Sequence, residues 1–413
     1  MMRTGAAVLA LAALAACSND VPTATGTDLF PSGTEMTTID LLLPSDQFLS
    51  EDTVYDGYTD VRNASYLLVA NLFDGALNAH GLVRFAGFPD SVEYNNGTIF
   101  VTDSVFTYGK GRITAQIDTL ASVPQSMVLR LYALEQPWDS SAATWQKASP
   151  QVAWRTPGGT LGDLIAEATW ERGDTAQLDT VVWQVDSLAM KKLAAPGFAG
   201  LAVTAAQTGT RVQLSSLDVT AQVHPSSKPD TSLAVTPTTY TQTFIYDPPP
   251  PTSAAALRAG GISGARSILN LKLDHLVPTC ADPAAGCPMV PLKDVTLNRA
   301  ILILDPLSVP SGFRPTVTHF VQLRRVLEPE LGRQGSLGEV LAQDSLQASL
   351  FEPPIGKSAE VDITLIVGAY ADSASIRLAM LSTSQTASFG TLWFSRSPRL
   401  RLVYTLPRTP KLP

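Results

Sequence analysis

Two tryptophans, Trp138 and Trp145, flank a short polar loop within residues 129–150 and are the side chains best suited to binding a ligand. Indole rings offer a large flat surface at a low entropy cost, which suits stacking on the face of a sugar. Asp139 and Gln146 each follow one of the tryptophans and can exchange hydrogen bonds with sugar hydroxyls. The pattern predicts a carbohydrate site at these four side chains. The alternative is that the loop folds back and both rings cap the core of a β-sandwich.

Residues for catalysis or for a metal ion form no comparable pattern. The sequence contains neither a G-x-S-x-G elbow nor an H-E-x-x-H helix motif, and its four histidines are scattered singly. We therefore expect no catalysis and no cofactor, with a weak candidate Ca²⁺ site at Asp56 and Asp60. A polysaccharide-degrading enzyme is a further alternative, because 37 acidic residues do not reveal which two carboxylates would face each other at about 5–10 Å.

Two of the three cysteines, Cys280 and Cys287, lie seven residues apart in the segment TCADPAAGCP. The spacing does not fit a zinc site, and His275 alone would not complete four ligands. Export to an oxidising compartment favours a disulfide between them.

The N-terminus predicts export and a lipid anchor at the third cysteine, Cys17. Residues 1–16 contain one early positive charge and an apolar run too short to span a bilayer as a stable helix. The end of this run, Leu14-Ala15-Ala16-Cys17, resembles the lipobox of bacterial lipoproteins, which implies cleavage before Cys17 and acylation of that residue. An ordinary signal peptide with a chance cysteine is the alternative.

The residues after Cys17 predict a tethered protein. Ser18, rather than an aspartate, follows the cysteine, which favours the outer membrane as the destination. Residues 17–38 are rich in Ser, Thr, Pro and Gly, a composition that cannot bury a core. We expect an outer-membrane lipoprotein whose folded part lies in water, on the periplasmic or the cell-surface face.

The charge of the chain limits its partners. A formal charge of −8 and the lack of any Lys/Arg cluster argue against nucleic acid. The expected partners are the membrane, through the N-terminal lipid, and a polysaccharide. The sequence leaves the oligomeric state open.

The hydrophobic pattern has a period of two. Segments such as MVLRLYA (127–133) and RLRLVYT (399–405) alternate polar and large apolar residues, and 30 prolines and 28 glycines interrupt the chain often. This pattern is typical of an all-β sandwich or barrel. Two segments, 161–170 and 337–350, have enough helical periodicity to predict short helices.

The strands repeat in two divergent copies. Residues 66–88, 123–134 and 200–223 have counterparts in the same order at 256–274, 295–304 and 375–406. We predict two tandem antiparallel sandwiches, with a single large domain as the alternative. The expected division lists a signal peptide at 1–16, a lipidated cysteine and tether at 17–38, a first sandwich at 39–225, a linker at 226–237 and a second sandwich at 238–408.

The landmarks of the two copies resemble the DNRLRE-type domain, a family that overlaps carbohydrate-binding module family 96. The matching residues are Arg84, Phe85, Leu129, Leu131, Tyr132, Trp138, Trp145 and Pro150 in the first copy, and Val361–Thr364, Phe394, Ser395 and Pro398–Leu402 in the second. The first copy lacks the FxS…SPxL ending, and the second lacks the tryptophan loop. The resemblance implies jelly-roll-like sandwiches on a secreted or surface bacterial protein.

The sequence thus predicts a non-catalytic, lipid-anchored surface protein that binds carbohydrate through the tryptophan loop. A structural or adhesive envelope protein without sugar binding is the alternative. Exposure of the two indole rings distinguishes them, because open rings favour sugar binding and buried rings favour the structural role.

Overall fold

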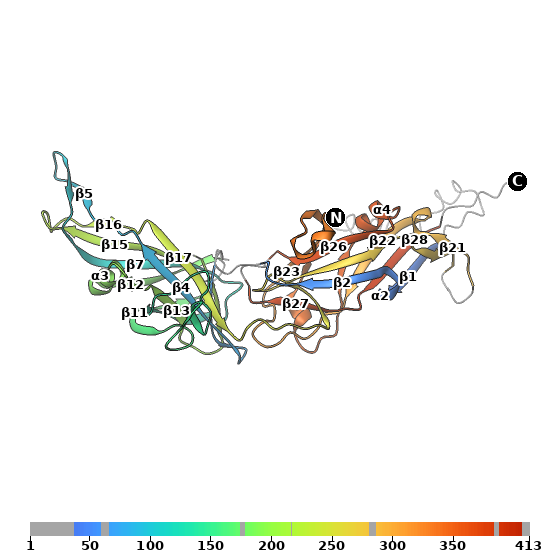
Figure 1. Ribbon diagram of the computed structural model, residues 1–413, viewed down its shortest axis with the longest axis horizontal. Coiled ribbons are helices and arrows are strands. Elements are labelled where there is room, and N and C mark those ends of the chain that lie inside the picture. Colours follow the sequence, from blue (N-terminus) through green and yellow to red (C-terminus); the bar gives the residue numbers. More distant parts are fainter. Residues whose placement is uncertain are drawn as a thin grey trace, which may run out of the picture.

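The computed structural model describes residues 37–58, 66–173, 178–215, 217–280, 286–383 and 388–406. The fold is all-β, and the strand pairs within the described residues are antiparallel, which confirms the predicted fold class. Two lobes lie end to end in an elongated molecule (Figure 1). Lobe 1 is built from residues 66–247, and lobe 2 from residues 37–58 together with 256–406.

Lobe 1 is one long run of paired strands that encloses a core. The order is β11-β8-β13-β4-β3-β14-β7-β15-β16, with β12 beside β7 and β17 beside β4. A small hairpin, β5–β6, projects from the end of the lobe remote from lobe 2 (Figure 1). The elements are β3 (Leu67–Phe73), β4 (Leu77–Ala86), β5 (Val92–Asn95), β6 (Phe100–Asp103), β7 (Phe106–Asp118), β8 (Ser126–Leu134), β9 (Lys147–Ser149), β10 (Val152–Ala153), β11 (Leu161–Glu171), β12 (Leu178–Val185), α3 (Ser187–Leu193), β13 (Leu201–Ala205), β14 (Thr210–Leu214), β15 (Asp218–Pro225), β16 (Leu233–Val235) and β17 (Thr239–Asp247).

The alternation of the sequence builds the core of lobe 1. Successive side chains of a strand point to opposite faces, so every second residue of β8 and β12 is buried. Trp183 on β12 is fully buried, and its indole N–H donates to Leu129 O on β8 at 3.0 Å. This bond links β12 to β8, two strands on opposite sides of the core.

Lobe 2 is a sandwich of a four-stranded sheet, β1-β28-β22-β25, and a five-stranded sheet, β2-β19-β26-β23-β24, with the two-stranded pairs β18–β27 and β20–β21. The elements are β1 (Thr38–Pro44), α2 (Ser45–Phe48), β2 (Leu49–Tyr55), β18 (Ala256–Gly260), β19 (Arg266–Lys272), β20 (Leu276–Pro278), β21 (Met289–Pro291), η4 (Leu292–Asp294), β22 (Thr296–Leu304), β23 (His319–Val326), η5 (Pro329–Gln334), β24 (Leu337–Leu346), η6 (Ala348–Phe351), β25 (Ala359–Asp362), α4 (Thr364–Tyr370), β26 (Ser375–Ser382), β27 (Thr391–Ser395) and β28 (Arg399–Thr405).

The two lobes repeat one pattern of pairing. In lobe 1, β3 pairs with β14, β4 with β13 and β7 with both β12 and β15. In lobe 2, β18 pairs with β27, β19 with β26 and β22 with both β25 and β28. The first and third segment pairs of the sequence repeat therefore occupy equivalent places. The second pair does not, since β8 corresponds by its pairing to β23 and not to β22.

The edge strands of the two copies are exchanged. The two strands that precede the core strands of the first copy, β1 and β2, pair with β28 and β19 of lobe 2. The two that precede the core strands of the second copy, β16 and β17, pair with β15 and β4 of lobe 1. Each lobe is thus completed by the leading strands of the other copy, an exchange within one chain of the kind that occurs between protomers in domain swapping.

This exchange overturns the expected domain boundaries. Residues 39–55, expected in the first sandwich, belong to lobe 2, where Ile39, Leu43 and Phe48 lie in the core. The expected linker 226–237 contains β16, and β17 continues lobe 1 to residue 247. The crossing to lobe 2 comes at residues 248–255, which include the run of four prolines.

The two helices expected at 161–170 and 337–350 were also wrong. These residues form β11 and β24, at the edges of their sheets, and only residues 348–351 make a short turn of 3₁₀ helix. Pairing with β8 and β23 outweighs the weak helical periodicity, because local propensity yields to tertiary context.

A shared apolar cluster joins the lobes. Phe244 on β17 and Phe313 and Phe389 of lobe 2 are each at most 1% exposed, and the rings of Phe244 and Phe389 meet edge to face with centroids 6.1 Å apart. An ion pair of 3.4 Å between Arg314 and Asp74 lies beside it. The lobes are therefore held together by a common apolar cluster and the ion pair beside it.

Candidate functional site

The tryptophan loop lies against the sheet of lobe 1. Trp138 is only 4% exposed, and its indole N–H donates to Ala199 O at 2.9 Å. It belongs to a separate apolar cluster on the outer face of β4, β13 and β17 with Leu82 and Ile245, both fully buried. A sugar ring has no access to the face of this indole.

Trp145 is half-buried and packs against His80, with ring centroids 4.8 Å apart. The Trp145 carbonyl accepts from Gly158 N–H at 2.7 Å, and a Cβ at Gly158, whose φ is +87°, would lie 2.8 Å from the indole. Burial lowers the pKa of His80, whose Nδ1 lies 2.6 Å from the Gly158 carbonyl oxygen. Gly158 thus allows the loop to close tightly over Trp145.

The two polar residues of the predicted sugar site serve the loop itself. The Asp139 carboxylate accepts the backbone N–H of Ser141 at 2.8 Å, and the Asp139 N–H donates to Ala148 O. Gln146 is exposed, and its carbonyl accepts from Trp154 N–H at 3.1 Å. The four residues do not form an open stacking platform. The geometry agrees with the alternative, in which the loop shields apolar side chains that would otherwise face water.

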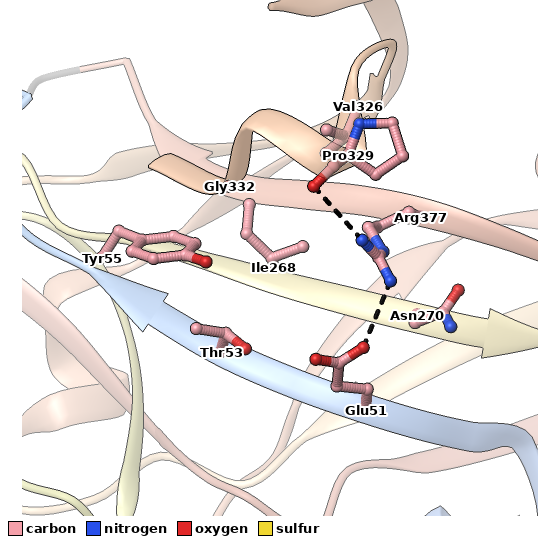
Figure 2. Close-up of a pocket in the computed structure, with 9 residues that line it drawn as sticks. All are labelled: Glu51, Thr53, Tyr55, Ile268, Asn270, Val326, Pro329, Gly332 and Arg377. Atoms are coloured by element: carbon pink, nitrogen blue, oxygen red, sulfur yellow. Dashed lines mark hydrogen bonds and ion pairs between the residues drawn. The ribbon is translucent and has the colours of Figure 1, made fainter. Parts of the chain in front are cut away.

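Lobe 2 lacks the tryptophan loop, and Figure 2 shows what occupies the equivalent place. Pro329 follows the end of β23 by three residues, as Pro137 follows the end of β8. Beneath it, Arg377 donates to Glu51 at 3.2 Å and to Pro329 O at 3.5 Å (Figure 2). A cavity of about 40 Å³ remains, lined also by Ile268. This space admits a water molecule and is too small for a sugar.

Of the two residues of the candidate Ca²⁺ site, Asp56 is engaged in an ion pair. The Asp56 carboxylate forms a two-pronged ion pair with Arg258, at 2.9 and 2.6 Å, and Ser263 also donates to it. Because Arg258 is 8% exposed, this carboxylate neutralises a nearly buried cation and is not available to a metal. Asp60 lies outside the described residues. Within the described ranges, no group of three or more His, Cys, Asp or Glu side chains is placed to hold a metal ion.

The predicted disulfide is confirmed. Cys280 and Cys287 are bonded, with their Cα atoms 5.9 Å apart, beside the β20–β21 hairpin. The Tyr404 hydroxyl donates to Pro278 O at 2.7 Å and ties this hairpin to β28. Cys17 lies outside the described residues, and no helix in the described part of the chain is long and apolar enough to cross a membrane.

A groove of lobe 1 lies beside Trp138. Its volume is about 530 Å³, and three segments meet there: the end of β4, the tryptophan loop at Pro137, and the segment after α3. The lining residues are Arg84, Phe85, Ala86, Gly87, Phe88, Asp90, Pro137, Ala194, Ala195, Pro196, Gly197, Phe198 and Ala199. All but two of these are apolar residues or glycines.

Arg84 is the cation of this groove. Its guanidinium lies over the Trp138 ring, 5.4 Å from the centroid, and donates a long hydrogen bond of 3.5 Å to Trp138 O. Arg84 was one of the residues that carry the family resemblance in the sequence, but it was not predicted to bind a ligand. Its contact with Trp138 spans 54 residues of sequence, so no local pattern reveals it.

No protein-family model matches the chain, and neither does any curated protein. Among solved structures, the C-terminal domain of the Streptococcus agalactiae AgI/II polypeptide BspA aligns with 86% of this chain and 92% of its own, at 9% identity and a TM-score of 0.17. The C-terminal domain of the Streptococcus pyogenes antigen I/II-family protein AspA aligns with 81% and 93%, at 8% identity and a TM-score of 0.14. Scores this low carry no argument about function.

Proposed function

We propose that this protein is an exported, lipid-anchored, non-catalytic component of the bacterial envelope with a structural or adhesive role. Lobe 2 would lie next to the outer membrane, and lobe 1 would project from it. We favour this role over sugar binding by the tryptophan loop, because the Trp138 ring is buried against the sheet.

The observation that carries the proposal is the pairing of β1 with β28. Thr38 lies opposite Thr405, so both described ends of the chain leave lobe 2 together. They do so at the end remote from lobe 1 (Figure 1). A lipid on Cys17, joined by the tether to the start of β1, would hold this end of lobe 2 near the membrane.

The junction between the lobes supports a spacer role. Separation of the lobes would leave the pairs of β1, β2, β16 and β17 intact, but it would expose the apolar cluster at the junction. Exposed apolar surface is unfavourable in water. The two lobes would therefore present a fixed distance between the anchored end and the distal hairpin.

Two experiments test the proposal. Labelling of cells with an alkynyl palmitate should tag the wild-type protein but not the Cys17→Ser variant. For orientation, a dye is placed on the exposed residues Asn298→Cys of lobe 2 or Asn96→Cys of lobe 1, with an acceptor dye on lipid headgroups of liposomes carrying the protein. Transfer should be strong from position 298 and weak from position 96. Equal transfer, or lipid labelling that survives loss of Cys17, contradicts the proposal.

A further inference from the structure

We propose that the groove beside Trp138 binds a small monocarboxylate with a compact apolar body, and that Arg84 holds the carboxylate. The groove does not depend on the anchoring of the protein, so this inference stands or falls separately from the proposed function.

The lining of the groove sets the apolar part of the ligand. Its volume of about 530 Å³ is within the range of about 300–1,000 Å³ that is common for small-molecule sites. Phe88 and Phe198 are half-buried and contribute ring surface, and Pro137 and Pro196 are exposed on the rim. Burial of a phenyl-sized group against this surface is favourable, because the apolar surfaces of both the groove and the ligand then leave water.

Arg84 sets the charged part of the ligand. Its side chain is half-buried, yet within the described residues it forms no ion pair with a carboxylate, and its hydrogen bond to Trp138 O is at the 3.5 Å limit. A guanidinium has five N–H donors in a planar fork that matches a carboxylate. The groove therefore offers an unsatisfied donor set next to apolar surface.

Asp90 limits the charge of the ligand. It is the only carboxylate among the lining residues, and it is exposed. The groove thus has one cation, Arg84, and one anion, Asp90. This favours a ligand with a single negative charge over a phosphate or a polyanionic chain, because a second negative charge would have no cation to pair with and would be repelled by Asp90.

The walls of the groove are fixed before a ligand binds. The Trp138 indole N–H holds Ala199 O at 2.9 Å, and its ring lies under the Arg84 guanidinium. Next to it, Gly200 has a φ of +118°, and a Cβ there would lie 2.6 Å from Val83 O. Trp138 is therefore a positioning residue for Arg84 and for one wall, which gives the buried ring a role in binding without ligand contact.

The test is calorimetric titration of the full-length protein in buffer, with titration of each probe into buffer alone as the blank. The probes are 4-phenylbutyrate and its neutral match, 4-phenylbutyramide. Arg84→Met removes the charge but keeps an apolar stem, and Ala195→Trp fills the groove from an exposed position. Arg112→Met, at an exposed arginine on β7 outside the groove, is the matched control.

The carboxylate should bind the wild type and the Arg112→Met control at least about tenfold more tightly than the amide does, as one charge-assisted hydrogen bond requires. In Arg84→Met the two probes should bind equally, and Ala195→Trp should abolish binding of both without lowering Tm. The proposal is overturned if neither probe binds the wild type saturably, if the amide matches the carboxylate there, or if Ala195→Trp binds as the wild type does.

Discussion

Arg211 on β14 of lobe 1 faces His319 on β23 of lobe 2 across the lobe junction, and burial together with the charge of Arg211 lowers the pKa of His319 to about 4. Both side chains are buried, at 3% and 1% exposure, and His319 Nδ1 lies 3.3 Å from Ser382 Oγ. Two basic groups thus meet in a place that accommodates the charge of only one of them.

This relationship predicts a loss of stability in mild acid. The folded state keeps His319 neutral down to about pH 4, whereas the unfolded chain protonates it near its ordinary pKa of 6.5. Between these values the unfolded state binds more protons, so the contribution of His319 to the free energy of unfolding is constant above about pH 6.5 and falls as the pH drops to about 4. Urea denaturation at pH 7.5 and 4.5 measures the loss.

The His319→Gln variant isolates this contribution. Buried His80 titrates in the same direction, so part of the acid loss should remain. We expect the variant to lose at least about 1 kcal/mol less than the wild type over this range. Parallel curves for the two proteins would show that His319 does not carry the effect.

The strand exchange predicts which fragments fold. Residues 66–247 contain every strand of lobe 1, including β16 and β17, and should unfold cooperatively as an isolated fragment. Residues 39–225 lack β17, which leaves one side of β4 without its partner strand. Circular dichroism and urea melts of the two fragments make the comparison. A more stable 39–225 fragment would show that the strands are not exchanged in solution.

The junction cluster predicts a large effect of one aromatic side chain. Phe389 is 1% exposed and meets Phe244, Tyr246 and Phe313 edge to face. Phe389→Ala should lower the free energy of unfolding by about 3–5 kcal/mol. The nearby Arg314→Met variant removes a partly exposed ion pair and a hydrogen bond to Val309 O, and should cost less, about 1–2 kcal/mol. Chemical denaturation of both variants tests this ranking, and equal losses would contradict it.

Burial of the tryptophan loop predicts a graded series at Trp138. Trp138→Ala should destabilise by about 3–5 kcal/mol because it leaves a cavity over Leu82 and Ile245. Trp138→Phe keeps a ring but leaves Ala199 O without its donor, at a cost of about 1–2 kcal/mol. Because Trp145 is only half-buried, Trp145→Ala should cost less stability than Trp138→Ala. Denaturation midpoints rank the three, and a neutral Trp138→Ala would mean that the ring is exposed.

The disulfide predicts a moderate and local contribution. Cys280 and Cys287 close a short loop, for which the chain-entropy estimate is about 2–3 kcal/mol. The double Cys→Ser variant should therefore lose about that much stability, as measured by thermal or urea unfolding. The wild type under reducing conditions should show the same loss and serves as the check, because a reductant effect on the double variant would point to another cause.

The sequence by itself determined the elements whose information is local. Period-two alternation placed β8 and β28 as half-buried strands, because one face of each has to leave water. The short spacing of Cys280 and Cys287, in a chain expected to be exported, was enough to predict their bond. The first and third segment pairs of the repeat were also predicted correctly from the sequence, whereas the second pair was not.

Only the tertiary structure decided which surfaces meet. β1 and β16 are both apolar edge strands, so alternation cannot tell which lobe each completes, and that choice depends on contacts far apart in sequence. The indole of Trp138 can pack on a sugar face or on an apolar sheet equally well, and in the folded protein it is buried against the sheet. The groove at Arg84 arises for the same reason, since three separate segments create it only after folding.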